Sequence, residues 1–151
     1  MSELSESIYL TMAPRLTLAG AKLALDAAER TAVANGWRVC IAITDTAGNL
    51  MAFSRLDGAS AGSIEAAIAK SRTAGKFGMP TKLFQDMCDD GHPSFASIEG
   101  AIMIEGGVPI SVNGMVFGAV GASGAKGADD ATVALSGVKA LMEQYSTAQS
   151  V

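Results

Sequence analysis

A glycine-rich run near the end of the chain, residues 106–124, limits the folds that this sequence can adopt. Two short apolar segments meet there at Asn113-Gly114, a strong hairpin signal because both central residues of a type I′ turn need positive φ. Gly118 and Gly121 lie inside or at the end of the second segment, where glycine weakens a strand unless something must approach the backbone closely. The run therefore predicts a β-hairpin that another subunit or a ligand approaches.

Turn signals and hydrophobic periodicity divide the rest of the chain into helices and strands. The sequence predicts helices over 17–35, 63–77 and 81–88, a last helix capped by Asp129 or Asp130, and strands over 38–45, 50–55, 101–105, 109–112 and 115–121. Short turns join the strands within each group, so neighbours pair antiparallel. We expect an α/β fold of the α+β type, with a five-stranded antiparallel sheet covered by helices on both faces.

The length of 151 residues fits one domain, which we expect over residues 16–151 after an N-terminal arm of residues 1–15. Only 17% of residues are charged and 49% are apolar, which is explained if other subunits cover part of the surface. No apolar stretch reaches the roughly 18 residues of a membrane span. The net charge of −4, without a basic stripe, argues against a nucleic-acid partner.

The cysteines indicate the compartment. Cys40 and Cys88 are the only two, and they lack Cys-x-x-Cys spacing. Such thiols are typical of reduced cysteines in the cytosol rather than of a zinc site. The N-terminus carries Glu3 and Glu6 and no long apolar core, so a secretory signal peptide is not expected. We therefore expect a cytoplasmic protein without a bound metal.

Four segments in a fixed order carry a resemblance to a known family: residues 45–59, 67–74, 106–110, and 118–124 followed by Asp130. Together they resemble the GlcG/HbpS-like family, sometimes labelled haem-degrading, over roughly residues 15–142. The resemblance implies a profilin-like five-stranded sheet between helices and a homo-oligomer, often an octamer. Its functional implications diverge: some members bind haem, others accompany glycolate, diol or aromatic catabolism, a related domain accompanies cobalamin adenosyltransferases, and a few relatives are thought to be lyases or isomerases.

Two basic residues are candidates for chemistry. Arg55 ends a predicted strand, where its guanidinium could hold a carboxylate in a bidentate fork or could pair with Asp57 or Asp45. Lys70 lies among alanines in a predicted helix, where small neighbours could partly desolvate it and suit it to general acid–base catalysis. Alternatively, it extends along a solvated edge of the helix. Because Ala67-x-x-Lys70 matches the family, the catalytic role for Lys70 carries about the same weight as the role of a solvated lysine.

The glycine loops and the residues beside them could form the walls of a cleft. Backbone amides and the hydroxyl in the loops at Gly106-Gly107 and Ser123-Gly124 could bind an anion, although glycines there could equally serve a bulge or turn. Glu105 precedes the first loop and is a candidate acid or base, unless its side chain faces solvent. These loops are therefore candidates for ligand binding.

Two further candidates lie in polar loops. Asp45, at the first hairpin turn, is a candidate ligand-binding residue. His92, the only histidine, lies beside Asp89 and Asp90, whose charges would repel haem propionates, so it is a poor axial ligand. It could act as a catalytic acid or base at the mouth of a site, but an exposed loop histidine is the favoured interpretation.

The sequence thus leaves two functions open. We expect first a cofactor-independent lyase or isomerase that acts, between subunits, on a small carboxylate such as a hydroxylaminobenzoate-like aromatic one. Arg55 would hold the carboxylate, Lys70 or Glu105 would move a proton, and the loop amides would stabilise developing negative charge. The alternative is a non-enzymatic oligomer that binds haem or a corrinoid in the same groove.

Overall fold

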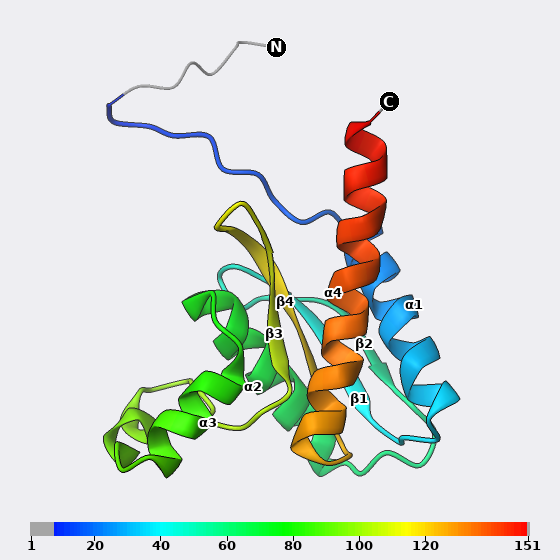
Figure 1. Cartoon of the computed structure of the whole chain (residues 1–151), viewed down its shortest axis with the longest axis vertical. Helices are drawn as coiled ribbons and strands as arrows, with labels where there is room; N and C mark the ends of the chain where they lie inside the picture. Colours follow the sequence, from blue (N-terminus) through cyan, green and yellow to red (C-terminus); the bar gives the residue numbers. More distant parts are fainter. Residues whose placement is uncertain (1–7, 151) are drawn as a thin grey trace.

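The computed structural model describes residues 8–150 (Figure 1). Its helices are α1 (Leu18–Ala34), α2 (Gly62–Phe77), α3 (Thr81–Asp89), the 3-10 helix η1 (Pro93–Ser97) and α4 (Gly127–Gln149). Its strands are β1 (Cys40–Asp45), β2 (Leu50–Arg55), β3 (Gly107–Val112) and β4 (Met115–Ser123). No helix within residues 8–150 is long and apolar enough to cross a lipid bilayer.

The sheet of the described residues has four strands, in the order β2-β1-β4-β3, and every neighbouring pair is antiparallel. The expectation of five strands is wrong, because residues 101–105 form a connection instead of a strand. Its backbone bonds to side chains: the N–H of Ile102 donates to Thr73 Oγ1 (3.0 Å) and that of Glu105 to Gln85 Oε1 (2.9 Å). A short apolar segment has the same sequence pattern in a strand and in an irregular connection, so the pattern could not distinguish the two for residues 101–105.

Local signals placed most other elements correctly. Thr17 caps α1 by accepting a hydrogen bond from the N–H of Gly20 (3.1 Å). Asn113 and Gly114 both have positive φ, at 51° and 78°, as the predicted hairpin turn requires. The last helix begins at Gly127, so the expected cap at Asp129 or Asp130 is wrong and both aspartates lie in the first turn.

Helices cover the two faces of the sheet in different ways (Figure 1). Helices α1 and α4 pack on one face, over the larger core that includes Ile41, Ile43 and Val120. Helix α2 packs on the other face, over a smaller core that includes Cys40 and Ala67. The alternation of large and small side chains along β1 therefore decides which helices each face receives.

Close approach of α2 explains the strand glycines. A Cβ added to Gly121 would lie 2.4 Å from the carbonyl oxygen of Ala67, and one added to Gly107 would lie 2.3 Å from that of Lys70. Both distances are far shorter than a van der Waals contact, so the helix backbone rests directly on the sheet backbone. The close neighbour that the sequence indicated at Gly121 is thus a helix of the same chain.

The N-terminal segment joins the domain at Leu16, which packs against the larger core. From Ile8 to Thr17 the chain forms neither helix nor strand, and Figure 1 shows it leading away from the start of α1. Residues 1–7 of the predicted arm lie outside the described residues. The division into an arm and a single domain stays a prediction.

Candidate functional site

Three strand residues form a row at one end of the sheet. Cys40, the first residue of β1, lies opposite Arg55 of β2 and opposite Ser123 of β4. Directly opposite residues of antiparallel strands point to the same face, so Arg55 and Ser123 share the α2 face with Cys40. They are two strand spacings apart, about 10 Å. We call this end of the sheet, with Arg55, Lys70, Glu105, Ser123 and Asp130, the polar end.

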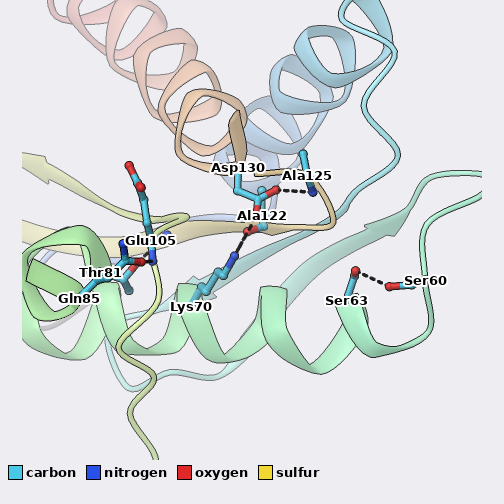
Figure 2. Close-up of polar contacts among 10 residues, drawn as sticks. Ser60, Ser63, Lys70, Thr81, Gln85, Glu105, Ala122, Ala125 and Asp130 are labelled. Carbon is cyan, nitrogen blue, oxygen red and sulfur yellow. Dashed lines mark hydrogen bonds and ion pairs between the residues drawn. The ribbon is translucent and has the colours of Figure 1, made fainter. Parts of the chain in front are cut away.

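A buried ion pair lies at the polar end (Figure 2). Lys70 of α2 and Asp130 of α4 are each only 2% exposed. Lys70 Nζ donates to Asp130 Oδ2 (2.9 Å) and to the carbonyl oxygen of Ala122 (3.1 Å), while Asp130 Oδ1 accepts the N–H of Ala125 (3.0 Å). The pair therefore ties α2, β4 and α4 together, and the alternative of a lysine on a solvated edge is wrong.

The ammonium group of Lys70 has one more donor than these two acceptors use. A Cβ added to Gly106 would lie 2.9 Å from Lys70 Nζ and 2.6 Å from the carbonyl oxygen of Ala122. Gly106 also has φ of 132°, which L side chains rarely adopt. A glycine is therefore required beside the ammonium group, both for space and for backbone conformation.

Glu105 lies next to this position and is half-buried. Its side chain rests against the start of α4, since a Cβ added to Gly127 would lie 3.1 Å from Glu105 Oε2. The first turn of a helix carries partial positive charge, which stabilises a carboxylate there. Figure 2 shows Glu105 and Lys70 at the same end of the sheet, below the start of α4.

The glycine loops are largely committed to the fold. The N–H of Gly107 donates to Thr81 Oγ1 (2.9 Å), and the carbonyl oxygen of Gly106 accepts the N–H of Ala122 (2.9 Å). A Cβ added to Gly124 would lie 2.5 Å from the carbonyl oxygen of Arg38. The amide of Gly107 is thus already bonded, and close packing accounts for Gly124.

Arg55 organises the loop that leads into α2. Its Nε and Nη2 both donate to the carbonyl oxygen of Ala59, at 3.2 and 3.0 Å. Arg55 is nevertheless exposed to solvent. Within residues 8–150 no ion pair joins it to Asp57 or Asp45, so that alternative is wrong. Burial raises the pKa of the neighbouring Cys40 thiol, and the charge of Arg55 opposes this only in part.

Asp45 and His92 lie away from the polar end. Asp45 is at the opposite end of β1, where its carboxylate accepts the N–H groups of Ala47 and Asn49, each at 2.9 Å. Burial alone would raise the pKa of Asp45, but the hydrogen bonds from Asn49 and Ala47, with the charge of Arg15, hold it below its ordinary value. His92 is exposed at the N-cap of η1.

Sequence reasoning missed the role of Asp130, which it interpreted as a helix cap. One signal was present: Asp130 lies three, four and eight residues before Val133, Ala134 and Val138, on the apolar face of α4. An acidic residue on such a face needs a buried partner, and Lys70 was the lysine with small neighbours. No cluster of three or more metal-binding side chains occurs among residues 8–150.

Comparisons with known proteins identify the family of this chain. The profile of the family described as "Haem degrading protein HbpS-like" matches residues 16–139. The chain belongs to the HbpS-like family. The resemblance inferred from the sequence motifs is thus confirmed.

The relatives of this HbpS-like chain include GlcG from Escherichia coli K12, which is 36% identical over 97 residues, covering 64% of this chain and 72% of GlcG. The crystal structure of a double mutant of HbpS from Streptomyces reticuli superposes with a TM-score of 0.81 at 29% identity, covering 92% and 95% of the two chains. The crystal structure of a PduOC–haem complex shares the fold, with a TM-score of 0.76 at 22% identity, covering 84% of this chain and 95% of PduOC.

Proposed function

We propose that this HbpS-like protein is an enzyme, a lyase or isomerase, that binds a small carboxylate at the polar end and moves a proton on it. One observation carries the proposal: four polar residues from separate segments gather at one end of the sheet. Arg55 and Ser123 lie in one row across the strands, and Lys70 and Glu105 lie at the same end (Figure 2). Helix α4 also begins there, and its positive end favours an anion. The arrangement suits a negatively charged ligand.

Arg55 is the residue that would hold the carboxylate. A guanidinium has five N–H groups. Two of them, one on Nε and one on Nη2, donate to the carbonyl oxygen of Ala59, and the others are left for a ligand. That bond also fixes the side chain, so less rotamer freedom is lost when a ligand binds. Arg55 and Glu105 stand about three strand spacings apart, roughly 15 Å, which two long side chains and an aromatic ligand can span.

Glu105 is better placed than Lys70 to move the proton. Lys70 is buried, and its ammonium group already donates to Asp130 and to the carbonyl oxygen of Ala122, so it is committed to bonds within the fold. Glu105 is half-buried beside the start of α4 and so can reach a ligand. Lys70 instead forms an ion pair with Asp130 beneath the site, and its remaining N–H donor would stabilise negative charge that develops on the substrate.

The test uses 4-hydroxylaminobenzoate, benzoate and glycolate as probes, with turnover and binding measured on purified protein. We expect Glu105→Gln to lower kcat by about 100-fold or more, the range for a general base, and Arg55→Gln mainly to raise KM. Arg30→Gln, on the exposed surface of α1, is the matched control. Unchanged turnover in both variants, or a failure of all three probes to bind, would contradict the proposal.

Haem binding is the second candidate, favoured by the description of the family and by the haem complex of PduOC. The only histidine fits this role poorly: His92 is exposed at the N-cap of η1, beside the carboxylates of Asp89 and Asp90. We therefore assign no haem chemistry to it. Titration with haemin decides, since a saturable, stoichiometric Soret shift that His92→Ala abolishes would favour this second function over the enzyme.

A further inference from the structure

A continuous groove crosses the opposite end of the sheet from the polar end. Three pockets, of about 340, 170 and 490 Å³, follow one another there. The first two share Arg15, Leu16 and Phe117. The second and third share Val112, Met142 and Tyr145. The groove therefore runs from the turn between β1 and β2, over the β3–β4 hairpin, to the C-terminal half of α4, and its shared side chains are mostly apolar.

The arm that emerges beside this groove is also apolar. Residues 8–14 contain no charged side chain. Ile8, Tyr9, Leu10 and Met12 are 89, 86, 68 and 59% exposed. A monomer rarely leaves so many large apolar side chains together in water unless the segment docks on something. The arm thus has the character of one half of an interface.

We propose that residues 8–14 of one copy lie in this groove of a second copy, and that two copies exchange arms across a two-fold axis. The root of the arm, at Pro14, Arg15 and Leu16, itself lines the groove. A two-fold axis close to the root therefore brings the groove of each copy next to the arm of the other. An extended segment of seven residues reaches about 23 Å, enough to follow the groove.

The geometry favours the partner's groove over the arm's own. Figure 1 shows the arm leading away from its own domain. A turn of the arm at Ala13 back onto its own domain is disfavoured, because a residue before proline is held extended. The chemistry also matches, because the uncharged arm would cover Tyr145, which lines the second and third pockets and is 42% exposed.

Photo-crosslinking tests the exchange directly. A benzophenone amino acid replaces Met12 in unlabelled chains, which are refolded together with ¹⁵N-labelled chains, irradiated and mapped by mass spectrometry. We expect adducts to ¹⁵N peptides from residues 111–117 or 141–149. The same probe at Val33, on the exposed side of α1, is the control and should give none there. Adducts confined to the probe's own chain, or to other surfaces of the partner, would overturn the proposal.

Assembly provides a second, independent measurement. Met12→Asp places a charge in the middle of the proposed contact and should raise the dissociation constant of the oligomer at least about tenfold, because burial of one methionine is worth that much or more. Val33→Asp is the matched control and should leave the constant unchanged. Met12 is 59% exposed within its own chain, so circular dichroism should show an intact fold. Equal sedimentation of Met12→Asp and the parent protein would refute the exchange.

Discussion

Replacement of Lys70 by methionine tests whether the buried ion pair holds the fold together. Methionine keeps most of the length and volume of the lysine side chain but removes its charge and its donors. The change would leave Asp130 Oδ2 and the carbonyl oxygen of Ala122 without the donor that each has now. Since Asp130 is 2% exposed, water cannot easily replace the lost partner.

Removal of one partner from a buried pair destabilises a protein by about 3–5 kcal/mol, because the remaining charge stays uncompensated. For a domain of this size each kcal/mol lowers Tm by about 2–4 °C, so we expect Lys70→Met to lower Tm by roughly 6–20 °C. The double variant Lys70→Met, Asp130→Asn removes both charges. The side-chain carbonyl of the introduced asparagine can still accept the N–H of Ala125, so the double variant should be more stable than Lys70→Met alone.

The assay is urea unfolding followed by circular dichroism, at one fixed protein concentration because assembly shifts apparent stability. Asp130→Asn completes the double-mutant cycle, which isolates the energy of the pair. Lys76→Met is the matched control: Lys76 lies in the last turn of the same helix and is exposed, so its loss should change stability by no more than about 0.5 kcal/mol.

Two results would refute this reasoning. If Lys70→Met lowered stability by less than about 1 kcal/mol, the pair would be no stronger than one on the surface. If the double variant were no more stable than Lys70→Met, the uncompensated charge of Asp130 could not be the cause of the loss. The second outcome would leave the hydrogen bond to Ala122 as the main contribution of the lysine.

Three further measurements examine other features. Gly121→Ala should destabilise by about 1–3 kcal/mol, since its methyl group would overlap the backbone of α2, whereas Gly62→Ala, with open space around it, should be neutral or stabilising in the same denaturation assay. Cys88 should react with a thiol reagent at least about tenfold faster than Cys40, because Cys40 is buried and burial raises the pKa of its thiol. Asp45→Asn should lower Tm at neutral pH. The folded-state pKa of Asp45 is depressed, so its contribution is present above the ordinary value of 3.8 and is lost as pH falls through the folded pKa; the two proteins should converge below that pKa.

Local chemistry explains which parts of the fold could be predicted from the sequence. Thr17, Asn113-Gly114 and the alternation along residues 38–45 act within a few residues, and each marked its element correctly. Residues 101–105 were misassigned because the partners of their backbone, Thr73 and Gln85, belong to helices far away along the chain. Apolar character alone does not say whether a backbone bonds to a strand or to side chains.

The candidate site was recovered in part for the same reason. Arg55 and Ser123 could be named from the sequence because each lies at the end of a predicted strand, but their common row depends on the pairing of β1 with β4, which local turn signals do not specify. The bond between Lys70 and Asp130 spans 60 residues of sequence, and no local pattern states that distance. Asp45 accepts a hydrogen bond from the N–H of Asn49 within its own turn. An aspartate at a turn fits either this local role or a ligand-binding role, so the sequence could not distinguish the two.

The two faces of the sheet should tolerate sequence change to very different degrees. Under α1 and α4 the core consists of side chains, such as Ile41 and Val120, which can repack around a substituted neighbour. Under α2 the contact is backbone on backbone at Gly107 and Gly121, where any added atom collides. Variation in ligand preference among proteins built this way would therefore have to arise in the loop that Arg55 anchors and in residues 98–105, while the floor of the polar end stays fixed.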